Sequence, residues 1–424
     1  METQTALAIP DEDNTMVVYS STQYPEAVQS VIARCLGIPF SNVLVITRRV
    51  GGGFGGKSFR SHTVATAAAL CAFKLGRPVR MYLNRSTDMI MIGGRHPIKA
   101  YYSVGFKSDG RITALHLDIL INAGISPDMS PLMPEYIMSG LKKYNWGALS
   151  FDIKVAPRPA PGRVSVLNDG SIVVEADTLN LIQGGLTAGS TSSESSCAAT
   201  LEACNLLVGR LKPVMEKLNQ QSGGGVSWDA LIAQAVKDNV NLSSSAYWVP
   251  GQESSTYLNY GAGVSEVEID LLTGTITSLR SDIVYDCGKS LNPAVDLCQI
   301  EGSFIQGIGF FINEEHETNV DGLVVSDSTW VYKIPSVDTI PKQFNAEVLN
   351  TGFHKNRVLS SKACGEPALV LASSVHCAVR EAIRAARKEF GSLQLTFQLN
   401  VPAPMTLQLP RADARLRRRA KEEH

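Results

Sequence analysis

A glycine-rich run near the amino terminus constrains the fold more than any other stretch of the chain. Five glycines occupy six positions in Gly51-Gly-Gly-Phe-Gly-Gly-Lys57, between an apolar, strand-like run at 43–50 and an alanine-rich, helix-like run at 63–73. Glycine accepts positive φ and lets another group approach the main chain closely. Free N–H groups at a helix start favour an anion. The residues therefore predict a turn that holds a phosphate- or dithiolene-bearing cofactor.

Two other interpretations of this turn stay open on the residues alone. Gly51 to Ser58 also satisfies the pattern of a nucleotide-binding phosphate loop, with Lys57 and Ser58 at the nucleotide-contacting positions. Such a protein should continue as alternating strands and helices of a parallel sheet, whereas the following segments here read as paired strands. The glycines could also serve close packing only.

Composition excludes several classes of function. The net charge of −1 gives no overall field that would attract nucleic acid or an acidic membrane surface. The eight cysteines contain no CxxC pair, so neither a zinc site nor an iron–sulfur cluster is predicted, and we expect buried free thiols. No secretory signal and no apolar run of about 18 residues is visible. These features predict a cytoplasmic protein.

A proline-rich stretch divides the chain. Residues 156–162, Ala-Pro-Arg-Pro-Ala-Pro-Gly, resist both helix and central strand, because proline lacks an N–H group and fixes φ. We therefore expect one domain over residues 1–155 and a second over 163–392. Residues 393–424 are expected to form a C-terminal tail that is charged from Arg415 onward.

The segments within these domains carry further signals. Hairpins are predicted for 99–121 and for 263–285, on paired apolar runs joined by turn residues. A second loop of small residues, Gln183–Ser190, precedes a predicted helix at 191–211. Gly302, Gly307 and Gly309 lie in the helical run 294–311, where they indicate close packing. Residues 126–147 are expected to be irregular, and 368–390 to form one long helix. His96, beside Pro97, is expected to be structural.

Several stretches resemble the molybdenum-cofactor portion of plant aldehyde oxidases, within the xanthine dehydrogenase family. The resemblance covers most of residues 1–392. The stretches that carry it are Met1–Pro10, Arg48–Lys57, Gly94–Pro97, Tyr332–Phe344 and Leu359–Pro367.

The resemblance implies an α+β fold with two mixed α/β subdomains of the molybdopterin-binding type. It also implies oxidation of an aldehyde to a carboxylic acid at a molybdopterin centre, in a protein that forms homodimers. Glu366 would be the catalytic base, and Phe54 and Gly189 would lie near molybdenum without being side-chain ligands. The residues implied to bind the cofactor are Gly53, Phe54, Gly55, Ala188, Gly189 and Ser190.

Ser58 points to the substrate class. Xanthine-oxidising members of the family carry a glutamate after the lysine of this loop, where it hydrogen-bonds a purine. Serine cannot replace that charge-assisted contact, so an aldehyde is the expected substrate and Ser58 is assigned to its pocket.

The chain also departs from the family pattern. Only seven residues bridge Val155 and Arg163, where family members carry a long segment with an arginine-bearing loop near the metal. A stretch with a GQG loop is absent between Glu175 and Ala176. The 2Fe-2S and FAD modules of the family have no counterpart in these residues. A non-catalytic remnant or an interaction module of the family therefore stands as the alternative to an enzyme.

Overall fold

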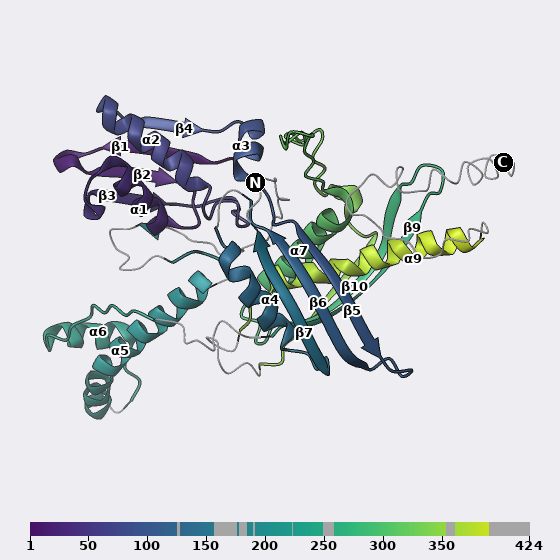
Figure 1. The fold of residues 1–424 in the computed structure, drawn as a ribbon. Coiled ribbons are helices and arrows are strands. Elements are labelled where there is room, and N and C mark those ends of the chain that lie inside the picture. Colours follow the sequence, from purple (N-terminus) through teal and green to yellow (C-terminus); the bar gives the residue numbers. More distant parts are fainter. Residues whose placement is uncertain are drawn as a thin grey trace.

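The fold is built from three sheets and the helices that cover them (Figure 1). The computed structural model describes residues 1–124, 128–156, 176–177, 185–189, 191–222, 224–248, 258–352 and 361–389. The proline-rich stretch after Ala156, the tail at 393–424 and Ser190 lie outside the described residues. The two domain boundaries therefore stay predictions.

The first sheet has five strands in the order β4-β1-β2-β3-β8. Strand β1 runs antiparallel to both β2 and β4, β2 runs parallel to β3, and β3 runs antiparallel to the short β8. The strands are β1 (Thr5–Pro10), β2 (Met16–Ser20), β3 (Val43–Thr47), β4 (Val79–Tyr82) and β8 (Ala176–Asp177). Strand β8 brings a segment from beyond the proline-rich stretch onto the edge of this sheet.

Two helices cover the first sheet, α1 (Pro25–Leu36) and α2 (Ser61–Leu75). Helix α2 follows the glycine-rich run, as predicted. Ala65, Ala68, Ala69 and Ala72 on its inner face are fully buried, and their small side chains let the helix approach the strands closely. The core of this unit also contains Val18 and other apolar strand residues.

The second sheet contains the first predicted hairpin. Strands β5 (Ile98–Phe106) and β6 (Ile112–Asn122) pair antiparallel, and β7 (Ala148–Ala156) runs parallel to β6. Helix α3 (Arg85–Ile92) precedes the hairpin. The expectation that 126–147 is irregular is wrong in part, because α4 (Met133–Leu141) lies within it. Proline in the first turn of α4 costs no hydrogen bond, so it starts the helix there.

The third sheet contains the second predicted hairpin. Strands β9 (Tyr260–Ile269) and β10 (Ile276–Asp286) pair antiparallel, and β11 (Gln343–Leu349) runs parallel to β10. The helices that pack with this sheet are α7 (Pro293–Ile308), α8 (Gly365–Ala368) and α9 (Ser373–Glu389). The single long helix expected at 368–390 is wrong, because a 3-10 turn at Leu369–Ala372 separates α8 from α9.

A helical pair extends away from the sheets at the lower left of Figure 1. Helix α5 (Thr191–Ser222) is longer than predicted and contains Pro213. Helix α6 (Trp228–Lys237) packs against it through a small apolar cluster that includes Leu211, Val214 and Leu231. The cluster explains why α5 continues past residue 211.

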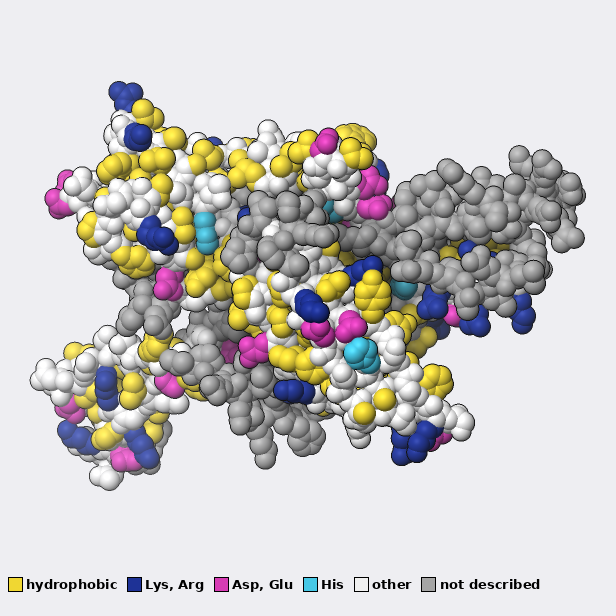
Figure 2. All heavy atoms as spheres, in the orientation of Figure 1, with side chains coloured by type: hydrophobic (Ala, Val, Ile, Leu, Met, Phe, Trp, Pro, Cys, Tyr) yellow, Lys and Arg dark blue, Asp and Glu magenta, His cyan; other side chains and the backbone are white. Residues whose placement is uncertain are grey.

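The surface agrees with the near-neutral composition. Basic and acidic side chains are interspersed over the face drawn in Figure 2.

The expectation that the cysteines are buried is wrong for most of them. Only Cys287 and Cys364 are buried, whereas the other six cysteines are exposed. Cys35, for example, lies one position off the buried face of α1. None of the described helices has the length and apolar character needed to span a bilayer.

A substitution at Gly307 tests the predicted close packing of α7. A Cβ at this position would lie 2.6 Å from both the Ala372 Cβ and the main-chain oxygen of Leu369. We expect Gly307→Ala to lower the free energy of unfolding by about 1–3 kcal/mol, because the backbone must shift to accept the methyl group. The measurement is urea-induced unfolding.

The matched control is Gly209→Ala on the exposed surface of α5, where no atom lies within 4 Å of the added Cβ. This control should gain stability by about 0.5–1 kcal/mol from helix propensity. Equal effects at the two positions would contradict the packing assignment.

Candidate cofactor site

The glycine-rich loop, residues 51–57, follows β3 and adopts a conformation that needs glycine. Gly52 and Gly55 have φ values of +106° and +82°, and a Cβ on Gly52 would lie 2.3 Å from the Phe54 ring. Phe54 itself has φ +51°, which is unusual for a bulky residue and marks a strained position of the kind found at functional sites. The loop therefore holds its shape through tertiary contacts.

Gln23, between β2 and α1, makes the main contacts to this loop. Its Oε1 accepts hydrogen bonds from the main-chain N–H groups of Gly55 at 3.0 Å and Lys57 at 3.3 Å. A Cβ on Gly53 would lie 2.5 Å from the same oxygen. Gln23 belongs to no motif, and a single polar residue before a helix gives no signal from which its role could have been predicted.

The second predicted loop was expected at 183–190, and its described part, residues 185–189, meets the glycine-rich loop at Gln23. Gln23 Nε2 donates to the main-chain oxygen of Thr187 at 3.0 Å, and the Thr187 N–H donates to the main-chain oxygen of Gln23 at 2.9 Å. Ala188 and Gly189 follow directly, and Gly189 has φ +57°. The structure thus joins two loops whose linking residues are 164 positions apart.

Glu366 lies beside the second loop. A Cβ built on Gly189 would be 3.9 Å from Glu366 Oε2, so no side chain separates the carboxylate from this loop. Glu366 is half-buried and stands in the first turn of α8. The predicted base and the predicted cofactor loops therefore converge.

A buried ion pair fixes the segment that leads to Glu366. Lys362 Nζ lies 3.0 Å from Asp286 Oδ2, with side-chain exposures of 6% and 13%. The next residue is fixed as well, because the main-chain oxygen of Ala363 accepts a hydrogen bond from Asn259 Nδ2 at 3.0 Å. Burial alone would raise the pKa of Asp286, but hydrogen bonds from the Gly288 N–H, Lys362 and Thr351 outweigh it and hold the pKa below its usual value.

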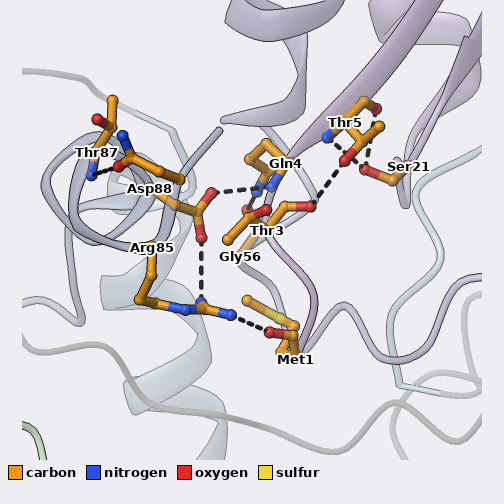
Figure 3. A network of polar contacts seen from close by, with 10 residues as sticks. Met1, Thr3, Gln4, Thr5, Ser21, Gly56, Arg85, Thr87 and Asp88 are labelled. Carbon is orange, nitrogen blue, oxygen red and sulfur yellow. Dashed lines mark hydrogen bonds and ion pairs between the residues drawn. The ribbon is translucent and has the colours of Figure 1, made fainter. Parts of the chain in front are cut away.

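A polar network braces the other side of the glycine-rich loop (Figure 3). Gln4 Nε2 donates to the main-chain oxygen of Gly56 at 2.8 Å, and the Gln4 N–H donates to the fully buried Asp88 at 3.0 Å. Arg85 pairs with Asp88 at 3.5 Å and donates to the main-chain oxygen of Met1. The first residues of the chain therefore support the loop through hydrogen bonds.

Lys57 is part of this interior and does not face a ligand. Its side chain is 1% exposed. Burial lowers the pKa of its amine, while the carboxylates of Glu2 and Asp88 act in the opposite direction. A phosphate-loop lysine has to reach its nucleotide, and the sheet of such a protein is parallel. The nucleotide-loop interpretation is therefore wrong, and Lys57 stabilises the loop from inside.

Two other predicted residues have clear positions. Ser58 is 5% exposed at the end of the glycine-rich loop, and the His62 ring forms a hydrogen bond with its main chain. The place of Ser58 in a substrate pocket stays a prediction. His96 Nε2 lies 2.7 Å from Ser130 Oγ, in keeping with its expected structural role.

The loop has donors to offer to a ligand. Within the part of the chain that the structure describes, no hydrogen bond engages the main-chain N–H groups of Gly52, Gly53 and Phe54. Unpaired main-chain donors on a glycine-rich turn suit a group that carries oxygen or sulfur acceptors. The residues present therefore fit an anionic, pterin-type cofactor, which the two loops would hold.

The Lys362–Asp286 ion pair, in the segment that leads to Glu366, predicts how the stability of the fold depends on pH. The pKa of Asp286 is lowered by folding, so its stabilising effect is complete above the unfolded value of about 3.9 and is lost as the pH falls through the folded value. We expect Asp286→Asn to lower the free energy of unfolding by about 1–3 kcal/mol at pH 7. That difference should shrink below pH about 4.

The measurement is urea-induced unfolding from pH 7 down to pH 3, with the exposed Asp321→Asn as the control. The control should show no such pH-dependent difference from the wild type. A wild-type minus Asp286→Asn difference that stays constant with pH would contradict the assignment.

Comparisons with known proteins agree with this geometry. Two family models, both described as molybdopterin cofactor-binding domains, match residues 1–158 and 148–341. An aldehyde oxidase-like protein of Oryza sativa subsp. japonica is 58% identical, with 96% of this chain and 42% of the relative covered. The abscisic-aldehyde oxidase of Arabidopsis thaliana is 46% identical over the same shares of the two chains.

Solved structures show the same fold. A Cu,Mo-CO dehydrogenase superposes with a TM-score of 0.69 at 14% identity, covering 96% of this chain and 74% of that one. The aldehyde oxidoreductase of Desulfovibrio gigas gives a TM-score of 0.64 at 16% identity, covering 95% and 58%. At these identities the likeness shows the fold alone.

The chain spans less than half the length of the curated relatives it matches. The alignment with the rice protein extends over 565 positions, more than the 424 residues of this chain, so the relative carries internal residues that have no counterpart here. The α+β, molybdopterin-binding fold expected from the sequence is confirmed, and the chain belongs to the aldehyde oxidases of the xanthine dehydrogenase family, within their molybdopterin-binding portion.

Proposed function

We propose that this chain forms the molybdopterin-binding portion of an enzyme that oxidises an aldehyde to a carboxylic acid. The observation that carries the proposal is the convergence of three parts of the chain. The glycine-rich loop is joined through Gln23 to the 185–189 loop, and Gly189 of that loop lies against Glu366. The sequence identity to plant aldehyde oxidases supports an aldehyde as the substrate class.

When bound, the molybdenum cofactor supplies the two-electron oxidation. This chain's residues bind and orient it. The N–H groups of Gly53 and Phe54 would face it from one side, and Ala188, Gly189 and Ser190 from the other. Glu366 would accept a proton at its carboxylate oxygen as a general base, and its position next to Gly189 supports this role.

Ser58 is proposed to border the substrate rather than to act chemically. Its hydroxyl carries no charge, so it offers a purine no charge-assisted hydrogen bond. Domains over 1–155 and 163–392 are part of the same proposal, with the cofactor between them. A homodimer, as in the family, is proposed for the assembly.

A second candidate is a non-catalytic or interaction role. The observation in its favour is the alignment that exceeds the length of this chain, because the residues without counterpart could include cofactor contacts. Cofactor content alone does not separate the two candidates, since a remnant could still bind. Turnover that depends on Glu366 separates them.

The test is Glu366→Gln, expressed in a host that makes the molybdenum cofactor. We expect turnover of an aromatic aldehyde with an artificial electron acceptor to fall by about 10²- to 10⁴-fold, because the amide cannot accept the proton. Molybdenum per chain should stay unchanged, because glutamine has nearly the same size.

The control is Glu381→Gln on the exposed face of α9, which should leave turnover as it was. Wild-type chain that holds molybdenum but shows no turnover would support the non-catalytic role. Turnover that survives in Glu366→Gln would remove Glu366 as the base.

A further inference from the structure

We propose that Gln23 is the positioning residue that fixes the two cofactor loops relative to each other. The inference rests on the proposed function for what the loops bind. The relative position of the loops is a property of this chain, and the hydrogen bonds that fix it can be probed without any cofactor. No motif of the sequence marks Gln23, and its role follows from its contacts.

The side chain of Gln23 uses both ends of its carboxamide. Oε1 accepts from the N–H groups of Gly55 and Lys57 on the glycine-rich loop, and Nε2 donates to the oxygen of Thr187 on the second loop. The carboxamide carries an acceptor and two N–H donors in the same fixed plane. Gln23 is 9% exposed, so water competes little for these bonds.

The main chain of Gln23 repeats the pattern. Its N–H donates to the oxygen of Lys57 at 2.9 Å, and its oxygen accepts from the N–H of Thr187 at 2.9 Å. Both loops are therefore tied to the same residue twice, once by main chain and once by side chain. Main-chain bonds survive a substitution, so variants at position 23 isolate what the carboxamide adds.

The position of the Gln23 side chain explains why residue 53 is a glycine. A Cβ on Gly53 would lie 2.5 to 2.7 Å from three atoms of the Gln23 side chain. Gly53 is thus required for the carboxamide to reach Gly55 and Lys57. Loop contacts of this kind decide reactivity when a bound group must be held within about an ångström of its working position.

Two variants separate the two halves of the contact. Gln23→Glu keeps an oxygen that can accept from Gly55 and Lys57. It loses the N–H donor to Thr187 and brings a carboxylate oxygen close to the main-chain oxygen of Thr187, which is repulsive. Gln23→Met has a similar length and removes both halves. The matched control is Gln29→Glu, because Gln29 is also buried, lies in α1 and donates to the oxygens of Val43 and Phe40, outside the two loops.

The first measurement is amide hydrogen exchange of the cofactor-free protein. Gln23→Met should speed exchange about tenfold at Gly55 and Lys57 and also in residues 185–189, because the loss of a buried hydrogen bond is worth about that factor. Gln23→Glu should speed exchange in 185–189 alone. Gln29→Glu should change neither loop.

The second measurement is the rate at which molybdenum is lost during dialysis of protein made in a cofactor-competent host. Both Gln23 variants should lose it faster than Gln29→Glu at matched thermal stability. Gln23 variants that exchange like Gln29→Glu in both loops, or that lose molybdenum no faster than it, overturn the proposal. A wild-type chain that never contains molybdenum contradicts the proposed function instead, and the exchange result still decides the role of Gln23.

Discussion

The site depends on one constraint, which is that loops from distant parts of the chain meet at one place. The glycine-rich loop belongs to the first sheet, and the 185–189 loop lies just before α5. Strand β8 pairs with β3 at the edge of the first sheet and brings the chain beyond the proline-rich stretch to that sheet. Gln23 then joins the two loops through paired hydrogen bonds, and Glu366 completes the arrangement from the third sheet's helices.

Each of these three parts is fixed by buried polar contacts. Asp88 and Gln4 hold the glycine-rich loop from one side, and the Lys362–Asp286 pair holds the segment before Glu366. Buried hydrogen bonds and ion pairs favour one arrangement over its alternatives, because a displacement leaves a donor or a charge without its partner. The strained φ of Phe54 persists only because its surroundings are fixed in this way.

Local patterns predicted much of the fold. The two hairpins, the helix after the glycine-rich loop and the close packing at Gly307 follow from turn residues, periodicity and small side chains, which act over short distances. Strand β1 and the break between α8 and α9 depend on tertiary contacts and had no local signal. The exposed cysteines show the same limit, since a free thiol carries no pattern that separates a helix's inner face from its outer one.

The sequence suggested candidate site residues but not the contacts that join their loops. The family resemblance supplied Gly53, Gly189 and Glu366, whereas the residue that joins their loops, Gln23, carries no motif. Lys57 shows the opposite case, because it completes a nucleotide-binding pattern and is nevertheless buried, where the charges of Glu2 and Asp88 act on its amine. A spacing pattern records which residues are present, and only the packing determines whether a side chain faces a ligand or the core.

The most direct test of this account is the molybdenum and pterin content of the unmodified chain, purified from a host that makes the cofactor. The account predicts close to one molybdenum and one pterin per chain, because both loops and Glu366 are already in place. A folded chain that contains neither would contradict the claim that these residues form a cofactor site.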